Sequence, residues 1–291
     1  MPRSRVTLPK LESPPASIAD YLISRFPHVS EPAWRDRFAR GLITIAEGVT
    51  LREDAPYRHG LLVYYEREVP LEPDSPEVET ILYQDSEILV ADKPHGMPVT
   101  PAGDYVARSL LARLERSTGL GTLAPLHRLD RDTAGLVLFS VNVSSRARYH
   151  ELFAKRVIER EYLAIARVNE VPEQTRWLVE NRIGAGTPWF RRQIVEGPVN
   201  AITEIELTEV PDGLGRFRLR PKTGKKHQLR VHMAAIGFPI LGDPVYPDLR
   251  EPQPSDPPLQ LVASRLSFTD PLNGVKRDFI TARFSGGRSF I

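Results

Sequence analysis

The sequence contains no cysteine among its 291 residues, which excludes disulfides, thiol catalysis and thiolate metal sites. It also has no apolar run approaching the ~18 residues that a membrane-spanning helix requires. Residues 1–16 are basic but rich in proline, and they lack the apolar core of a secretory signal. These absences predict a soluble, cytoplasmic protein.

The sequence also lacks an excess of charge of one sign. Its 39 lysines and arginines nearly balance 37 acidic residues, which gives a net charge of +2. Only local clustering can therefore indicate a partner. One basic run extends from Arg216 to Arg230, and no acidic residue follows it until Asp243. Such a run is typical of a polyanion-binding surface, where released counterions supply affinity, or of a solvated edge strand. The run alone leaves both interpretations open.

Prolines divide the chain into two parts. We expect an irregular arm at 1–16 and a small unit of two helices and a short sheet at 17–68. Pro70, Pro73 and Pro76 mark a linker at 69–78. Residues 79–291 then form one larger domain. Helices and strands are mixed in it without strict alternation, which favours an α+β fold with a mainly antiparallel sheet core flanked by helices.

Within the larger domain, apolar periodicity and stop signals predict three helices, which end at Gly119, begin after Ser144 and end at Gly237. The strands are predicted near residues 80–82, 88–91, 136–139, 161–166, 202–210, 216–220, 259–268 and 278–284. No internal repeat is present.

The most unusual segment is LHRLDRDTAGLVLF at 126–139, where charged residues precede a turn and a buried strand. Charge at the entrance to a core is costly unless it is paired, so we expect a site around Asp130. The alternatives are purely structural roles. Asp130 or Asp132 would only form the turn, and His127 would be a partly buried histidine whose hydrogen bonds are made within the protein. A divalent-metal phosphoesterase site of His127, Asp130 and Asp132 is a further alternative. These residues alone indicate only a possible polyanion-binding enzyme.

Four motifs follow one another along the chain: KPHGMPV at 93–99, HRLDRDTAG at 127–135, REYLA at 160–164 and TGKKHQLRVH at 223–232. The last is followed by GFPILGD at 237–243 and by Tyr246. In this order they resemble the signatures of the RluA-type pseudouridine synthases, over roughly residues 80–284. Arg160 and Lys225 depart from the lysine and arginine usual at those positions, and the exchange of arginine for lysine loses a bidentate fork. Residues 17–66 resemble an alpha-L RNA-binding module.

The resemblance implies a fold and an activity. The family isomerises uridine in rRNA or tRNA to pseudouridine without a cofactor or metal, by breaking the N-glycosidic bond, turning the base and forming a C–C bond to the same ribose. It implies that Asp130 is the nucleophile or anion, that Arg230 pairs with it, and that Tyr162 stacks on the target base. The partner is structured RNA, and a monomer with no membrane contact is expected. An RNA-binding or RNA-folding factor that has kept the fold without the activity is the alternative.

The resemblance also implies RNA contacts around the site. The target uridine lies in structured RNA and must be flipped out at a cost of a few kcal/mol, and His127 and Arg128 would fill the vacated stack. The remaining predicted RNA-binding residues are Lys222, Lys225, Lys226, His227 and Gln228.

Overall fold

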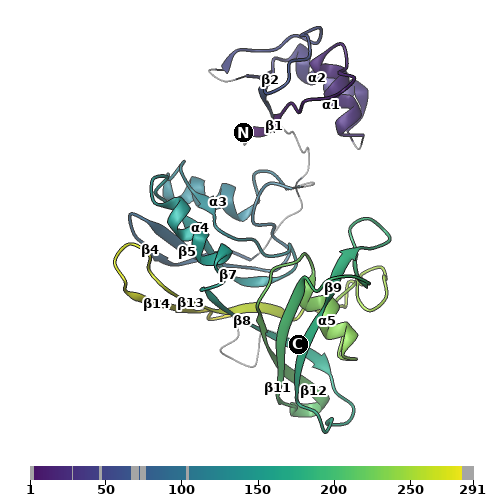
Figure 1. Ribbon diagram of the computed structural model, residues 1–291, viewed down its shortest axis with the longest axis vertical. Coiled ribbons are helices and arrows are strands. Elements are labelled where there is room, and N and C mark those ends of the chain that lie inside the picture. Colours follow the sequence, from purple (N-terminus) through teal and green to yellow (C-terminus); the bar gives the residue numbers. More distant parts are fainter. Residues whose placement is uncertain are drawn as a thin grey trace. The chain divides into compact units, whose positions relative to one another are not determined.

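The computed structural model describes residues 3–27, 29–45, 48–66, 72, 77–102 and 105–283. The chain divides into two compact units (Figure 1), one of Met1–Pro73 with Gly103–Ala107 and one of Asp74–Ala102 with Arg108–Ile291. Most of the predicted linker at 69–78 lies outside the described residues. The inclusion of 103–107 in the small unit is not predicted by the sequence, since those residues follow the proline-rich segment.

The small unit contains helices α1 (Ile18–Arg25) and α2 (Glu31–Ala39) and a three-stranded antiparallel sheet. Ser17 caps α1 in a capping box with Asp20, which satisfies two of the helix's free backbone donors. The sheet runs in the order β1 (Arg3–Thr7), β3 (Leu62–Glu66), β2 (Ile43–Thr44). The irregular arm predicted at 1–16 is therefore corrected for Arg3–Thr7. That strand is stabilised by pairing with β3 far along the chain, which local sequence cannot reveal.

The larger unit is built on one eleven-stranded sheet. Nine of its strands run in the order β10 (Arg192–Val195), β9 (Arg176–Ala185), β11 (Ala201–Glu209), β12 (Leu214–Pro221), β8 (Glu159–Arg167), β13 (Leu261–Thr269), β7 (Ala134–Ser140), β5 (Ile88–Lys93), β4 (Thr80–Gln84). Two more pair at the side, β14 (Lys276–Ile280) with β13 and β6 (Ala124–Pro125) with β7. The mixed α+β fold with a mostly antiparallel sheet is confirmed.

Helices α3 (Leu110–Thr118), α4 (Arg146–Ala154) and α5 (Gln228–Ala235) lie near the predicted positions. The cap of α4 is Ser145, one residue later than predicted. Strands β9 and β10 are not predicted. Within the described ranges, no helix has both the length and the apolar character needed to cross a bilayer.

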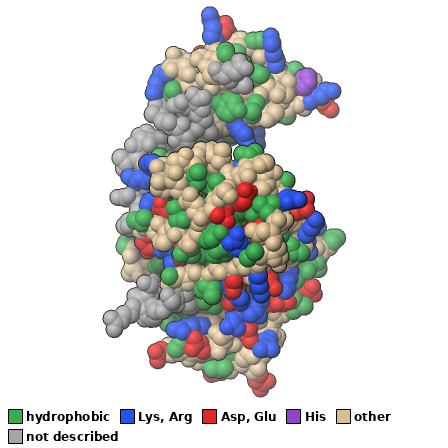
Figure 2. Space-filling model, turned by 90° about the vertical axis from the view of Figure 1, so that its left-hand side faces the viewer, with side chains coloured by type: hydrophobic (Ala, Val, Ile, Leu, Met, Phe, Trp, Pro, Cys, Tyr) green, Lys and Arg blue, Asp and Glu red, His purple; other side chains and the backbone are tan. Residues whose placement is uncertain are grey.

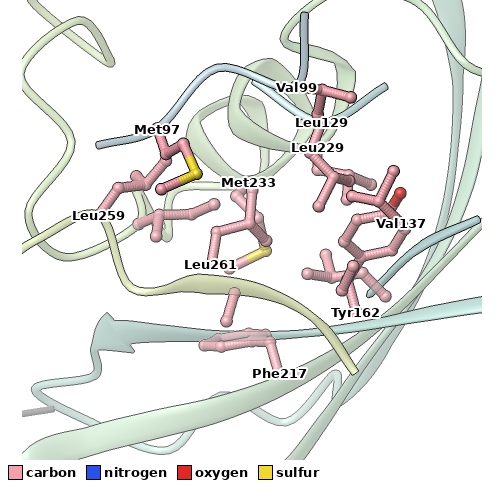
Figure 3. Packing of buried hydrophobic residues seen from close by; sticks show 14 of the residues in the cluster. Met97, Val99, Leu129, Val137, Tyr162, Phe217, Leu229, Met233, Leu259 and Leu261 are labelled. Atoms are coloured by element: carbon pink, nitrogen blue, oxygen red, sulfur yellow. The ribbon is translucent and has the colours of Figure 1, made fainter. Parts of the chain in front are cut away.

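The main apolar cluster positions the site. Figure 3 shows part of it, where Tyr162 of β8 packs in one cluster with Val137 of β7, Leu229 of α5 and Leu261 of β13. Residues from three other elements thereby enclose the ring of Tyr162, which is only 7% exposed.

The two halves of the large sheet meet at a parallel pair of β7 and β13, while every other described strand pair is antiparallel. At this seam Gly135 lies opposite Ala263, with φ +105°. A Cβ on Gly135 would lie 2.3 Å from the Ala263 carbonyl oxygen, where no real Cβ fits. The glycine of the Thr-Ala-Gly turn is thus required by the close approach of β13.

Gly135→Ala is expected to lower the free energy of unfolding by about 2–6 kcal/mol, because backbone strain and overpacking each cost about 1–3 kcal/mol. Urea denaturation measures this. Gly119→Ala is the matched control, since Gly119 also has positive φ (+73°) but its Cβ would meet nothing within 4 Å. It should cost only the backbone strain, about 1–2 kcal/mol. Equal losses in the two variants would contradict the close approach at the seam.

Candidate active site

A cavity of about 780 Å³ opens in the larger unit, a volume ordinary for a ligand site. It collects side chains from the loop before β7, from β8, and from the loop between β12 and α5 that continues into the helix. All ten predicted site residues line it: His127, Arg128, Asp130, Tyr162, Lys222, Lys225, Lys226, His227, Gln228 and Arg230. Segments that are far apart in the sequence are therefore brought to one place.

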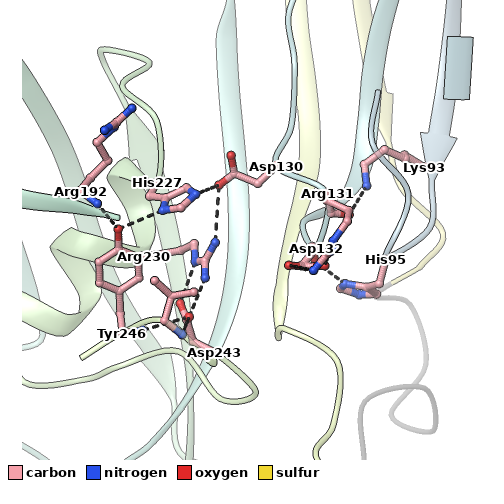
Figure 4. Close-up of polar contacts among 11 residues, drawn as sticks. Lys93, His95, Asp130, Arg131, Asp132, Arg192, His227, Arg230, Asp243 and Tyr246 are labelled. Atoms are coloured by element: carbon pink, nitrogen blue, oxygen red, sulfur yellow. Dashed lines mark hydrogen bonds and ion pairs between the residues drawn. The ribbon is translucent and has the colours of Figure 1, made fainter. Parts of the chain in front are cut away.

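Asp130 begins a tight turn, in which the Thr133 amide donates to the Asp130 carbonyl oxygen at 3.1 Å. Two residues of the KPHG segment hold this turn by hydrogen bonds to its backbone carbonyls (Figure 4). The ammonium of Lys93 donates to the Arg131 carbonyl at 2.9 Å, and His95 Nδ1 donates to the Asp132 carbonyl at 2.7 Å. The first motif therefore fixes the backbone on which Asp130 stands.

Lys93 is fully buried, and burial lowers its pKa to about 7. Besides the Arg131 carbonyl, its ammonium donates to the carbonyls of Pro94 at 2.8 Å and Met97 at 2.7 Å. Three carbonyl acceptors match the three N–H groups of a charged lysine, so this geometry favours the protonated form. Lys93 thus ties two motifs together through backbone oxygens.

Arg230 has a closer carboxylate partner than the sequence predicts. Its guanidinium makes a bidentate pair with Asp243, at 2.8 and 2.6 Å, whereas Asp130 Oδ2 lies 3.9 Å from Arg230 Nη1. Although burial disfavours its charge, the bonds to Asp243 raise the pKa of Arg230. Asp243 binds Nε and Nη2 of the guanidinium and leaves Nη1 for Asp130, so the predicted Asp130–Arg230 pair is present as a longer ion pair (Figure 4).

His227 links the site to the β10 strand. The Arg192 amide donates to the Tyr246 hydroxyl oxygen at 2.7 Å, and the same hydroxyl forms a hydrogen bond with His227 Nδ1 at 2.9 Å. The other ring nitrogen of His227, Nε2, faces Asp130 Oδ2 at 3.9 Å (Figure 4). Burial and the neighbouring Arg230 lower the pKa of His227 to about 3, so the imidazole is neutral. Its backbone lies in the left-handed region at φ +58°, a strained conformation often found at functional sites.

Asp130 lies in the cavity with its side chain 29% exposed. Burial raises its pKa, against the opposing effects of Arg230 and Lys226. Burial also raises the pKa of the Tyr162 hydroxyl, and the charge of Asp130 adds to that shift. The cavity therefore places a carboxylate near a largely buried, neutral tyrosine and a fixed guanidinium.

Two predicted RNA-binding residues have structural contacts instead. His127 Nε2 accepts the Leu138 amide at 3.0 Å, and its ring stacks on Phe153 at 5.0 Å. Gln228 is buried, and its amide oxygen accepts from the Thr223 hydroxyl and the Lys225 amide. Its amide nitrogen donates to two further oxygens. These polar atoms form hydrogen bonds within the protein, so both residues shape the cavity wall. The geometry of His127 is that of a partly buried histidine with an internal hydrogen-bond partner.

The basic run 216–230 is not an edge strand, because β12 pairs with β11 on one side and β8 on the other. Nor is it uniformly basic in three dimensions. Figure 2 shows basic and acidic side chains intermingled over the lower part of the larger unit. Acids of neighbouring strands pair with the run: Glu209 with Arg216, Glu206 and Glu161 with Arg218, Glu161 with Arg220, and Glu204 with Lys222. Within the run, the exposed loop lysines 225 and 226 form no such pair with an acidic residue of the described chain.

The structure does not direct the side chains of His127, Asp130 and Asp132 toward one point, as a metal site would require. His127 is directed at the Leu138 amide, while Asp132 forms an ion pair with Arg131 at 2.8 Å. Across the part of the chain that the structure describes, no three histidine or acidic side chains gather as a potential metal site.

Comparison with known proteins assigns this site to a family. The family model described as RNA pseudouridylate synthase matches residues 87–235. The dual-specificity RNA pseudouridine synthase RluA of Haemophilus influenzae is 34% identical, over 72% of this chain and 94% of its own length. An uncharacterized RNA pseudouridine synthase of Synechocystis is 26% identical, over 86% and 88% of the two chains. The solved structure of human RNA pseudouridylate synthase domain containing 1 is 25% identical, with a TM-score of 0.59, covering 72% of this chain and 86% of that one.

The chain therefore belongs to the RluA-type RNA pseudouridine synthases, enzymes that isomerise uridine in RNA. The resemblance seen in the four motifs is confirmed. Sequence reasoning missed Arg192, whose charge contributes to lowering the pKa values of both Lys226 and His227. It also missed the roles of Asp243 and Tyr246. Both residues follow the fourth motif directly, but only the fold shows which side chains they hold.

Proposed function

We propose that this enzyme converts specific uridines of rRNA or tRNA to pseudouridine, with Asp130 as the nucleophile on a flipped-out uridine. The observation that supports this best is the convergence of Asp130, Tyr162 and Arg230 in one cavity from three distant segments. The Haemophilus influenzae relative is named a dual-specificity RNA pseudouridine synthase, which is consistent with an RNA substrate.

The chemistry requires a carboxylate that acts while the base is detached. The bond from N1 of uracil to the ribose breaks, and a bond from C5 to the same ribose carbon forms. C5 then loses a proton and N1 gains one, so no atom is lost overall. Asp130 acts as the anion at the reacting nucleotide, in a role parallel to the nucleophilic carboxylate of retaining glycosidases. Arg230, held by Asp243, favours the ionised form of Asp130.

Tyr162 serves as the stacking partner of the uracil ring. Its own ring is fixed by the apolar cluster and lines the cavity, so it can receive a base without reordering. A stacked base is worth about 1–3 kcal/mol.

Arg128 is the residue that we expect to occupy the space vacated by the flipped uridine. Its side chain is exposed, and no described residue holds its guanidinium in a hydrogen bond or ion pair. His127, by contrast, would have to give up its bond with the Leu138 amide. Lys225 and Lys226 are exposed cations at the cavity, and we expect them to contact phosphates. Such contacts set affinity and register but carry little sequence information.

The deciding experiment treats rRNA and tRNA from a strain lacking this enzyme with the purified protein. New pseudouridines are then mapped by carbodiimide modification and primer extension. One or a few new sites in a single class of RNA are expected. Binding without any new pseudouridine in either class would favour the alternative of a non-catalytic RNA-binding or folding factor.

The pH dependence of conversion should report the ionisation of Asp130. Because burial raises its pKa and the anion is the reactive form, the single-turnover rate should fall on acidification at a higher pH than for an ordinary aspartate. Lys226 lowers the pKa of Asp130, so Lys226→Met should move this acid limb to still higher pH. Lys225→Met removes a neighbouring exposed lysine and should move it less. An acid limb that shifts to lower pH in Lys226→Met would contradict the assignment.

A further inference from the structure

The turn between β9 and β10 carries an aromatic residue that the cavity does not use. Trp189 is 81% exposed, more than any other large apolar side chain of the described residues. The adjacent Phe190 meets its ring edge-on, with centroids 5.9 Å apart and planes at 86°. A single exposed apolar residue needs no explanation by itself. Whether Trp189 has a binding role therefore depends on the residues that surround it.

The backbone around Trp189 is fastened to the body of the larger unit. The Arg191 amide donates to the Pro188 carbonyl at 2.8 Å, and its guanidinium donates to the Pro247 carbonyl at 2.7 Å. The same guanidinium lies 5.4 Å from the ring centroid of Tyr246. The Arg192 amide binds the Tyr246 hydroxyl. Hairpin tips usually belong to the least stable parts of a fold, whereas the backbone of this one is held by contacts with the rest of the larger unit.

The neighbours of the indole are cationic. The Lys226 ammonium lies 5.8 Å from the Trp189 ring centroid, within the range of a cation–π contact. Burial and then the charge of Arg192 lower the pKa of Lys226, which reflects crowding of positive charge beside the aromatic pair. Lys226 also lines the cavity that contains Asp130. Trp189 is therefore separated from the active site by one lysine side chain.

An exposed aromatic ring beside cations is the composition of a single-strand nucleic acid platform, where bases stack and phosphates meet positive charge. A protein-docking site is instead depleted of charge at its centre, and lysine in particular is under-represented. Charge complementarity and continuity with the cavity both favour RNA as the occupant.

We infer that Trp189 is a stacking platform for an unpaired base of the RNA that flanks the target uridine, with Lys226 facing the adjoining phosphate. This rests on the proposed action on structured RNA. Because the backbone that carries the indole is already held, little backbone freedom is lost when a base binds. The platform holds a second, unmodified nucleotide, and so it selects targets whose flanking base is free to unstack.

The test compares two oligonucleotides of about twelve nucleotides in equilibrium binding, oligouridine and its abasic analogue, which keeps the phosphates but has no bases. Trp189→Ala should weaken oligouridine binding about tenfold, as expected for one lost stack, and leave abasic binding within about twofold. Trp189→Phe should retain most of the affinity. The salt dependence should not change, because no phosphate contact is removed.

Leu178→Ala is the matched control, since Leu178 is an exposed apolar residue of the same hairpin, 61% exposed on β9. It should bind both oligonucleotides like the wild type. Fluorescence gives an independent readout, because stacking should quench Trp189, one of three tryptophans in the chain. That quenching should disappear in Trp189→Phe. If Trp189→Ala binds oligouridine as tightly as the wild type, the inference is overturned and the aromatic pair is left as a contact for another macromolecule.

Failure of this inference is distinguishable from failure of the proposed function. With a converted RNA, Trp189→Ala should raise KM about tenfold and leave kcat unchanged, since Trp189 touches no reacting atom. Normal conversion with unchanged KM overturns the platform alone. Base-dependent binding through Trp189 by a protein that converts no uridine upholds the platform and overturns the proposed function.

Discussion

Asp130→Asn should reduce uridine conversion at least about a thousandfold while leaving RNA affinity within about tenfold of the wild type. The amide has nearly the same shape but is a poor nucleophile, and loss of a nucleophile commonly costs more than this. Affinity should survive because phosphate contacts supply most of the binding, and the exposed lysines 225 and 226 are untouched. Single-turnover conversion and filter binding measure the two quantities.

Asp132→Asn is the matched control for this prediction. Asp132 is two residues away and is 28% exposed, but its carboxylate is engaged by Arg131. Its replacement should leave conversion within about tenfold, since the turn is held through backbone carbonyls by Lys93 and His95. A loss of RNA affinity in Asp130→Asn as large as its loss of activity would sink the role proposed for Asp130.

Arg230→Ala should lower the free energy of unfolding by about 3–5 kcal/mol and also abolish conversion. It strands the Asp243 carboxylate, whose side chain is fully buried, and an uncompensated buried charge carries a penalty of that size. It also removes a positive charge that faces Asp130 at 3.9 Å. Urea denaturation and single-turnover assays separate the two effects.

Arg265→Ala provides the matched control for stability. Arg265 makes a bidentate pair with Asp278 at similar distances, but both side chains are exposed, at 43% and 36%. Such a pair should contribute less than about 1 kcal/mol. Equal destabilisation by the two arginine substitutions would refute the importance of burial.

A double variant, Arg230→Met with Asp243→Asn, isolates the catalytic part of the effect. It removes both buried charges and keeps the carboxamide oxygen that can accept the amides of Val245 and Tyr246, as Asp243 Oδ1 does. Much of the stability should return, while conversion stays lost because the guanidinium that faces Asp130 is absent. Recovered activity in this variant would show that Arg230 acts only through stability.

The sequence predicted the site residues better than their contacts. Asp130, Tyr162 and Arg230 stand in motifs that can be read directly, and they line one cavity. The shorter second pair of Arg230, with Asp243, was not predicted, because which guanidinium nitrogen meets which carboxylate depends on ångström distances. Periodicity and motif order carry no such information.

The basic run illustrates a second limit. Along the chain no acidic residue lies between Arg216 and Arg220, yet acidic residues of adjacent strands pair with all three arginines: Glu209 with Arg216, Glu206 with Arg218 and Glu161 with Arg220. Strand register decides this neutralisation, and register is a property of pairing between distant segments. Two helix ends, by contrast, are determined by local sequence and were predicted correctly. The Ser17 cap and the Gly119 stop each act within one turn of helix.

The position of β13 in the sheet has a consequence for the synthesis of the enzyme. Its residues 261–269 pair with β7, which follows the Asp130 turn, and with β8, which carries Tyr162. Both strands precede it by a long stretch of chain, so long-range pairing must wait for its emergence from the ribosome. A nascent chain that has already exposed all four motifs would still lack a formed cavity. A fragment ending before residue 261 should therefore be inactive, although every residue proposed for catalysis is present in it.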